Sequence, residues 1–442
     1  MSWQTVLGFE VHIELGTASK MFCGCPGDHF GKSPNTQTCP VCLGLPGALP
    51  VPNAKAIEWC IKLGLSLNCQ VNLTSKFDRK NYFYPDLPKG YQISQYDQPF
   101  CHSGFLSLSS GKTIRITRVH LEEDTGKLQH ATANGEKVTL IDFNRSGVPL
   151  VEVVTEPDFS DSSQSDEFLK EIQQIVRVLG ISSADMEKGS MRLEANISVK
   201  PSEQSDLPGY KVEIKNVNSF RFIKKAVDFE VARQINILQS GQTPSQETRG
   251  YSERLGETYS QRTKEEAHDY RYFPEPDIPP LVFTQKQIDN WKSELPPLPG
   301  QLRNVLINKY ALSPAIAAII SANKDMHTIY TQAVGKSDIS PKILADFLIN
   351  KRYGELLPAT PSQLIQLIKS SQAQSSVSSD QIRKSVTRVL DTHPRAVADL
   401  KTGKQQAMFF IIGQIKRELG NIDIELTKNI IGELLKINRL QT

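Results

Sequence analysis

Ionisable and apolar residues alternate in residues 7–15, which read LGFEVHIEL. Successive side chains of a β-strand point to opposite faces, so the apolar residues would anchor one face in a core. Glu10, His12 and Glu14 would then stand in a row on the other face. Two carboxylates and an imidazole on one rigid strand suit a metal or phosphate site, and the solvated edge of an antiparallel sheet is the alternative.

Two later segments supply acidic residues that favour a metal or phosphate site. In residues 115–127, RITRVHLEEDTGK, a regular strand would put Glu122 on the polar face, whereas a bulge near the glycine would turn Glu123 there instead. The sequence does not choose between them. Glu152 lies inside the apolar run PLVEVV, where a carboxylate is costly unless it is paired or bound to a cation. Glu152 is therefore the leading functional candidate among the acidic residues.

The seven cysteines fall into a cluster of four and three scattered residues. The cluster has the spacing C-x-C-x13-C-x2-C and consists of Cys23, Cys25, Cys39 and Cys42. In a reducing compartment, two thiolate pairs on short knuckles fit tetrahedral zinc ligation better than they fit disulfides. Four reduced structural thiols are the alternative, because the first pair is C-x-C and not the commoner C-x2-C. A closed four-thiolate shell leaves no position for substrate, so the predicted zinc is structural.

Basic and aromatic residues are interleaved in residues 77–86, FDRKNYFYPD. Phosphate or single-stranded nucleic acid would find partners in Arg79, Lys80 and the neighbouring rings, and an ordinary packed loop is the alternative. No Walker A, H-E-x-x-H, G-x-S-x-G or G-x-G-x-x-G motif occurs. If the protein uses ATP, metal and basic side chains on a sheet must hold the phosphates.

The elements that position these residues belong to a chain of several domains. A length of 442 residues is too great for one ordinary core, and 39% hydrophobic with 22% charged residues is typical of a soluble globular protein. No apolar run approaches the roughly 18 residues of a membrane-spanning helix, and the start MSWQTVLG lacks a basic region followed by an apolar one. We therefore expect a cytoplasmic protein.

Two segments predict domain boundaries, the run LPPLPG at residues 295–300 and a Ser/Gln-rich piece at residues 370–380. They divide the chain into residues 1–292, which we expect to be α+β on a mainly antiparallel sheet, and two small all-α domains, 293–374 and 375–442.

Charge is distributed unevenly along the chain. Residues 293–442 hold 19 Lys and Arg against 12 Asp and Glu, and the first 292 residues hold 32 against 36. An acidic front part joined to a basic rear part suits a metal-using catalytic portion beside a portion that touches a polyanion. A solvated basic helical surface is the alternative for the rear part.

Six sequence blocks together resemble the successive signatures of GatB, the B subunit of the bacterial GatCAB aspartyl/glutamyl-tRNA amidotransferase. They occur in family order over about the first 280 residues: GFEVHIEL, FDRKNYFYPD with YQISQYDQP, RVHLEEDTGK, FNRSGVPLVEVVTEPD, EIKNVNSF and DYRYFPEPD. KTGKQQAMFFIIGQI at residues 401–415 is similar but weaker. Glu194 departs from the Asp that the family often carries, and some relatives lack the cysteines, so zinc is not essential to the chemistry.

The resemblance implies a ligase that transamidates Glu-tRNA(Gln) and/or Asp-tRNA(Asn) with a glutamine-synthetase-like cradle. ATP phosphorylates the side-chain carboxylate of the mischarged amino acid, and ammonia from an amidase partner then displaces phosphate. The implied cofactors are ATP, Mg²⁺ and structural Zn²⁺, and the implied assembly is a heterotrimer with this amidase and a third, small protein. Phosphoryl transfer needs divalent metal, a basic clamp and oriented dipoles, which the residues above can supply.

The resemblance also implies roles for particular residues. The implied Mg²⁺ ligands are His12, Glu123 and Glu152, with Glu10 and Glu122 close by. The implied contacts to ATP phosphate or acyl-phosphate are Lys80, Arg192, Lys215 and Asn218. The implied tRNA contacts in the last domain are Lys401, Lys404, Lys416 and Arg417. The alternative is a zinc-stabilised RNA-binding or scaffold protein without catalysis, which would have no need of a carboxylate within an apolar strand.

Overall fold

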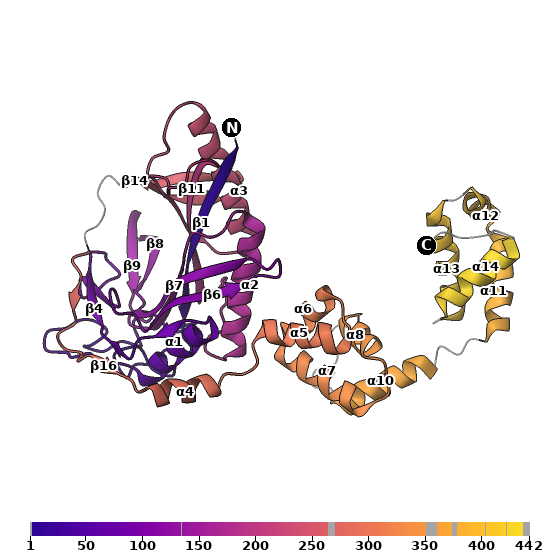
Figure 1. Cartoon of the computed structure of the whole chain (residues 1–442), viewed down its shortest axis with the longest axis horizontal. Helices are drawn as coiled ribbons and strands as arrows, with labels where there is room; N and C mark the ends of the chain where they lie inside the picture. The colour runs from indigo at the N-terminus through magenta and orange to yellow at the C-terminus, as the bar shows by residue number, and fades with distance from the viewer. Residues whose placement is uncertain are drawn as a thin grey trace. The chain divides into compact units, whose positions relative to one another are not determined.

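The computed structural model describes residues 2–133, 135–263, 270–350, 360–373, 378–402, 404–420 and 422–435. The chain forms two compact units, Met1–Pro299 and Gly300–Thr442 (Figure 1). The first combines sheet with helices, and the elements described in the second are all helical. This confirms the expected α+β class.

The first unit is built on a nine-stranded sheet within the described residues. Its strands are, in spatial order, β14 (Glu257–Thr263), β13 (Glu247–Ser252), β12 (Val212–Val217), β11 (Met191–Pro201), β1 (Trp3–Glu14), β10 (Pro149–Thr155), β7 (Thr113–Glu123), β6 (Cys101–Ser107) and β2 (Gln70–Val71). Neighbouring strands run antiparallel except for β12 and β13, which are parallel. The sheet is therefore mainly antiparallel, as expected, and β1 lies at its centre.

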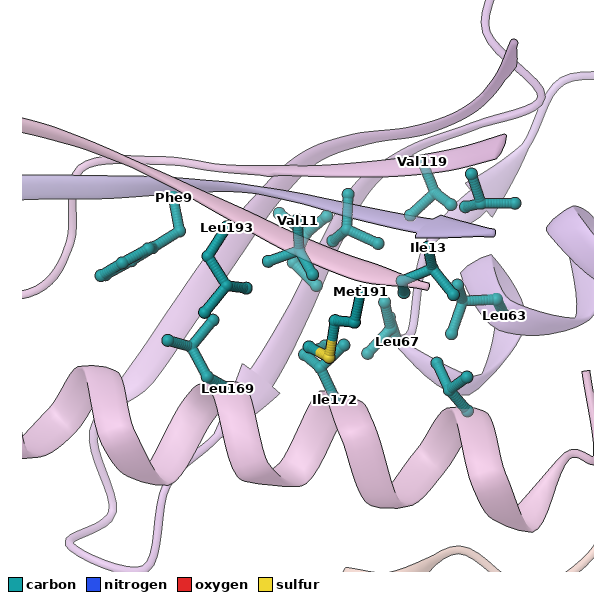
Figure 2. Close-up of a cluster of buried hydrophobic side chains, with 14 of the residues drawn as sticks. Phe9, Val11, Ile13, Leu63, Leu67, Val119, Leu169, Ile172, Met191 and Leu193 are labelled. Atoms are coloured by element: carbon teal, nitrogen blue, oxygen red, sulfur yellow. The ribbon is translucent and has the colours of Figure 1, made fainter. Parts of the chain in front are cut away.

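One face of this sheet is apolar and is covered by α1 (Ala54–Ser66), α2 (Ser162–Val178) and α3 (Phe220–Gln239). Figure 2 shows Phe9, Val11 and Ile13 of β1 pointing toward α2, from which Leu169 and Ile172 point back. All five of these side chains are at most 1% exposed. Full burial of one such side chain stabilises the fold by about 1.5–3 kcal/mol, so the alternation in β1 fixes which face turns inward.

Two of the covering helices begin at side chains that cap their free backbone N–H groups. Asn53 accepts hydrogen bonds from the backbone N–H groups of Lys55 and Ala56 at the start of α1. Asp161 accepts from those of Ser163 and Gln164 at the start of α2. Each cap stabilises its helix by about 1 kcal/mol.

Smaller sheets complete the first unit. A three-stranded sheet has the order β15 (Phe273–Pro274), β4 (Asp78–Asn81) and β5 (Tyr91–Ser94). The remaining pairs are β16 (Leu281–Val282) with β3 (Thr74–Ser75), and the hairpin of β8 (Lys127–Ala133) and β9 (Glu136–Asp142), and α4 (Gln285–Ser293) follows. The segments FDRKNYFYPD (residues 77–86) and DYRYFPEPD (residues 269–277) meet here, because Phe273 pairs with Arg79. Asp269, the first residue of the second segment, lies outside the described residues.

The three-stranded sheet lies over the polar face of the large sheet. β5 reaches the end of β7 through three hydrogen bonds: Ser94 Oγ donates to Glu122, and the Ile93 N–H and the side-chain amide of Gln92 donate to the carboxylate and the carbonyl group of Glu123. Residues of both sheets therefore line a space between the two sheets.

The second unit consists of helices over two separate hydrophobic clusters within the described residues. The first cluster lies between residues 306 and 368 and the second between residues 382 and 431. The helices are α5 (Pro299–Tyr310), α6 (Pro314–Ser321), α7 (Lys324–Lys336), α8 (Pro341–Asn350), α10 (Pro361–Ala373), α11 (Ser379–Thr392), α12 (Pro394–Lys401), α13 (Gln405–Leu419) and α14 (Ile424–Leu435). Residues 374–377 of the expected Ser/Gln-rich boundary lie outside the described residues, as do 403, 421 and 436–442 of the expected last domain. None of the helices described combines the length and hydropathy that crossing a membrane requires.

Candidate functional site

The register of the central strands sets four polar side chains in one row across the sheet. His12 on β1 lies opposite Arg192 on β11 and opposite Glu152 on β10. Glu152 in turn lies opposite His120 on β7. Because side chains two residues apart on a strand share a face, Glu122 belongs to the same face as His120. The polar side chains of residues 7–15 thus form one row of a larger polar surface on this face of the sheet.

Within this surface, one imidazole and two carboxylates converge. His12, Glu122 and Glu152 each offer a ligand atom, and these atoms lie within 4.8 Å of one another. Both carboxylate residues are buried, at 3% and 6% exposure. Two buried carboxylates this close repel each other unless a positive charge lies between them. One imidazole with two carboxylates is a donor set that suits a divalent cation.

In the protein alone, the imidazole of His12 supplies positive charge beside these carboxylates. Burial disfavours the charged form of His12, but the charges of Glu152 and Glu194 outweigh it and raise the pKa of His12 to about 9. Burial likewise disfavours the Glu152 carboxylate, yet His120 and His12 hold its pKa well below the ordinary value. Nε2 of His12 lies 3.5 Å from Oε2 of Glu152.

Glu123, which the resemblance implied as a cation ligand, lies outside this cluster. Its carboxylate accepts hydrogen bonds from the Lys89 ammonium group and from the Ile93 N–H at 2.9 Å. β7 pairs with β10 without a bulge near this point, so Glu122 keeps the face of His120. The candidate ligand set therefore has Glu122 in the place that the resemblance gave to Glu123.

Glu10 stands beside the cluster and is not among the three convergent residues. Its Oε1 accepts a hydrogen bond of 2.9 Å from the side-chain amide of Asn196. Burial, together with the charges of Glu152 and Glu194, raises the pKa of Glu10 above its ordinary value. Glu10 therefore adds to the local concentration of carboxyl groups.

A pocket of about 250 Å³ opens beside the convergent residues, between the large sheet and the three-stranded sheet. It is lined by His12, Lys80, Tyr82, Gln92, Glu122, Asp124, Thr125, Leu150, Arg192, Leu193, Glu194, Val217 and Asn218. Five residues singled out from the sequence thus share one cavity: His12, Lys80, Glu122, Arg192 and Asn218. Lys215 does not line it; its ammonium group lies 2.7 Å from the carboxylate of Glu194, which does.

The basic residues of the pocket are held in different ways. The Lys80 ammonium lies 5.0 Å from the ring centre of Tyr270. Burial opposes its charge, but Glu122 and Glu152 outweigh burial and raise the pKa of Lys80. Arg192 donates a hydrogen bond of 2.6 Å to Asp124. Two cationic groups therefore line the same pocket as His12 and Glu122 of the convergent set.

Arg79, the neighbour of Lys80 in the sequence, has a structural contact instead. Its guanidinium donates two hydrogen bonds of 2.7 Å to Glu275, whose side chain is fully buried. It also stacks 4.4 Å from the ring centre of Tyr91. The packed-loop interpretation applies to Arg79, whereas Lys80 lines the pocket.

Residues without a role in the sequence interpretation also contribute. Asp124 lines the pocket and holds Arg192, and His120 lies against Glu152. Nε2 of His29 lies 3.1 Å from Oε2 of Glu14, which connects the cysteine-rich loop to β1. The position of His120 on the polar face was a usable signal, but His29 lies in an irregular loop that has no periodic pattern to read.

The four clustered cysteines come together as the spacing predicts. Their sulfur atoms lie within 4.8 Å of one another, so the cluster can bind a metal. A hydrogen bond from the Cys23 thiol, the Cys39 N–H and the charge of Lys20 together lower the pKa of Cys42 to about 4, against the effect of burial. Thiolate is therefore favoured at Cys42, whereas the hydrogen bond with Cys42 and burial raise the pKa of Cys23, and burial raises the pKa of Cys25 to about 11.

A buried lysine, Lys20, lies against this cluster. It is only 1% exposed, and its ammonium donates to the carbonyl groups of Gln37 (2.8 Å) and Phe143 (3.3 Å). Its third contact is Sγ of Cys42 at 3.6 Å. A buried ammonium needs a nearby anion, and the contact with Cys42 supplies one when the sulfur is a thiolate.

Comparisons with known proteins identify the class to which this fold and site belong. Residues 5–289 match the family model described as the GatB/GatE catalytic domain, and residues 332–435 match one described as the GatB domain. The first unit is therefore a catalytic domain of the GatB/GatE class.

Full-length relatives narrow this class to one family. The B subunit of the aspartyl/glutamyl-tRNA(Asn/Gln) amidotransferase from Persephonella marina is 41% identical over 480 residues, covering 99% of this chain and all of the relative. The proteins of the same name from Caldanaerobacter subterraneus and Thermotoga maritima are each 40% identical, over 98% and 99% of this chain and all of each relative. The chain belongs to the family of aspartyl/glutamyl-tRNA(Asn/Gln) amidotransferase B subunits, which confirms the resemblance seen in the sequence.

Proposed function

We propose that this chain carries the site of ATP-dependent transamidation of Glu-tRNA(Gln) and/or Asp-tRNA(Asn). In the first step, the side-chain carboxylate of the amino acid attacks the γ-phosphorus of ATP, which gives an acyl-phosphate and ADP. In the second step, ammonia forms the amide bond and phosphate leaves, which gives Gln-tRNA(Gln) or Asn-tRNA(Asn). The observation that carries the proposal is the convergence of His12, Glu122 and Glu152 beside a pocket with two cationic groups.

The proposed roles follow from this arrangement. His12, Glu122 and Glu152 would hold Mg²⁺, which when bound neutralises charge on the phosphate oxygens. Lys80 and Arg192 would direct positive charge at the phosphate or acyl-phosphate, and Asn218 would donate hydrogen bonds from its amide.

Lys215 would act indirectly, through Glu194, because the two residues form an ion pair beside the pocket. Its direct contact would be with Glu194, not with the phosphate. Glu10 would raise the negative potential around the cation without binding it. Glu123 would support the end of β7 through Lys89 and β5.

The remaining parts of the proposal concern the assembly. Residues 1–292 would form a glutamine-synthetase-like cradle, and two small helical domains, 293–374 and 375–442, would follow. The last domain, 375–442, would contact the tRNA backbone. The proposed contacts are four exposed basic side chains, those of Lys401, Lys404, Lys416 and Arg417. Such phosphate contacts position the RNA without reading its sequence. The proposed partners are the amidase, which supplies ammonia, and the small third protein of the heterotrimer, in the cytoplasm.

We also propose that the metal of the cysteine cluster is a structural Zn²⁺. Four thiolates suit Zn²⁺ and leave no open position for a substrate. The buried ammonium of Lys20 would offset part of the negative charge of such a centre.

ADP formation by the assembled enzyme tests the proposed function. We expect ADP only when mischarged tRNA and Mg²⁺ are both present, and we expect Glu152→Gln to lower the rate on the order of 100-fold. Glu253→Gln, which changes an exposed carboxylate in the first unit, is the matched control and should leave the rate unchanged. Unaltered turnover in Glu152→Gln would contradict the proposed site, and a complete lack of ADP formation in the unmodified assembly would favour the scaffold alternative.

A further inference from the structure

We infer that His120 is a positioning residue that orients the Glu152 carboxylate by donating a hydrogen bond from Nε2. The role rests on the proposed function, because Glu152 is one of the three proposed cation ligands. His120 itself is not part of the convergent set of His12, Glu122 and Glu152.

Strand register is the first observation behind this role. His120 on β7 lies directly opposite Glu152 on β10, while His12 on β1 lies opposite Glu152 from the other side. Nε2 of His120 is 3.3 Å from Oε2 of Glu152, and Nε2 of His12 is 3.5 Å from the same oxygen. The two imidazoles therefore flank one carboxylate, and only His12 belongs to the ligand cluster.

The other ring nitrogen of His120 indicates which tautomer is present. Nδ1 is shielded from solvent and has no hydrogen-bond partner among the residues that the structure describes, and the residue is 3% exposed. A proton on Nδ1 would be a buried donor without an acceptor, which is costly. The neutral ring with its proton on Nε2 avoids this cost and aims its donor at Glu152.

A donor fixed in this way has a clear effect on a carboxylate that holds a cation. It restricts rotation of the carboxylate and occupies one lone pair, so the remaining lone pairs keep a constant direction. Partners of this kind behind metal ligands commonly contribute 10- to 100-fold in metal affinity or activity.

Three variants of His120 separate the donor from the shape of the ring. His120→Phe fills the volume without a donor, His120→Gln offers an amide N–H near the position of Nε2, and His120→Asn offers one near the position of Nδ1. Binding of Mn²⁺ alone to the assembled enzyme, followed by electron paramagnetic resonance of the free ion, measures affinity without activity. The Mg²⁺ dependence of ADP formation measures half-saturation and maximal rate separately.

We expect His120→Phe to weaken Mn²⁺ binding and to raise the half-saturating Mg²⁺ concentration by about 10- to 100-fold. The rate at saturating Mg²⁺ should stay within a few-fold of the original. His120→Gln should recover most of the affinity and His120→Asn should not. His130→Phe, which removes an exposed imidazole from the β8–β9 hairpin, is the matched control and should change neither quantity.

Unchanged Mn²⁺ affinity in His120→Phe, or equal affinity in His120→Gln and His120→Asn, would overturn the positioning role. If His120→Phe does not fold, as judged from its melting curve, the comparison of the Gln and Asn variants decides alone. Failure of the proposed function is distinguishable, because Mn²⁺ binding would then be insensitive to Glu152→Gln as well.

Discussion

At the scale of single residues, the site depends on which of two adjacent carboxylates faces the imidazoles. Glu122 lies within the cluster of His12 and Glu152, whereas Glu123 pairs with Lys89. Both are 3% exposed, so burial does not distinguish them. The partners of the two carboxylates distinguish them. We therefore expect the same substitution to have different effects at Glu122 and at Glu123.

We predict opposite results for Glu122→Gln and Glu123→Gln. Glu122→Gln should raise the Mg²⁺ concentration for half-maximal ADP formation about 10-fold or more, because it removes a proposed ligand charge. Glu123→Gln should leave that concentration nearly unchanged and instead lower the free energy of unfolding by about 1–3 kcal/mol, because the largely buried Lys89 loses its anion. Mg²⁺ titration and urea unfolding of both variants measure the two effects. A larger change of Mg²⁺ requirement in Glu123→Gln would contradict the ligand set.

At the scale of elements, long-range ion pairs and hydrogen bonds attach the small sheets and loops to the large sheet. Arg79 of β4 and Glu275, which follows β15, are 196 residues apart in the sequence. The cysteine-rich loop is attached in a similar way, because Ser146 Oγ donates to the Cys42 carbonyl and the Met21 N–H donates to the Gly147 carbonyl. These attachments determine where Lys80 and the end of β7 lie relative to β1.

We predict that Arg79→Met destabilises the fold by about 3–5 kcal/mol, because Glu275 then remains as a buried charge without a cationic partner. Urea unfolding followed by circular dichroism measures this. Arg115→Met is the matched control: its guanidinium pairs with Asp158 at the surface, where such pairs contribute about 0–1 kcal/mol. Equal effects of the two variants would show that the buried pair has no special role.

We predict that one equivalent of zinc copurifies with the chain and that Cys39→Ser lowers both the zinc content and the melting temperature, the latter by about 4 °C or more. Elemental analysis and a thermal melt measure the two quantities. Cys60→Ala, which changes a buried thiol outside the cluster, should leave the zinc content at one equivalent. Metal-free protein with an unchanged melt in Cys39→Ser would favour four structural thiols.

At the scale of the whole molecule, the chain separates a sheet-based catalytic domain from a helical unit that has its own hydrophobic clusters. The proposed functions are divided between the same two units. The convergent carboxylates and imidazole and the pocket beside them belong to the first unit, and the exposed lysines and arginine proposed to contact tRNA belong to the second.

We predict that the double variant Lys416→Gln and Arg417→Gln weakens binding of mischarged tRNA equally for different tRNA sequences. The slope of log affinity against log salt concentration should fall by about 2, because two phosphate contacts are lost. Binding measured at several salt concentrations gives this slope. Lys286→Gln with Lys292→Gln, in α4 of the first unit, is the control and should keep the original slope. An unchanged slope in the double variant of Lys416 and Arg417 would indicate that this basic surface is solvated and does not contact tRNA.

Local pattern was sufficient to predict much of the catalytic domain. The alternation of residues 7–15 predicted both the buried apolar face of β1 and the polar row that contains His12, because side-chain direction along a strand is a property of the backbone itself. The cost of a carboxylate in an apolar run singled out Glu152, and the spacing of four cysteines predicted their cluster.

The tertiary structure alone decided which of these side chains meet. Strand order and register decide whether Glu122 or Glu123 lies beside His12. They also decide that His120 flanks Glu152 and that Arg79 pairs with Glu275. Order and register arise from contacts between segments far apart in the chain, and no periodicity within one segment carries that information.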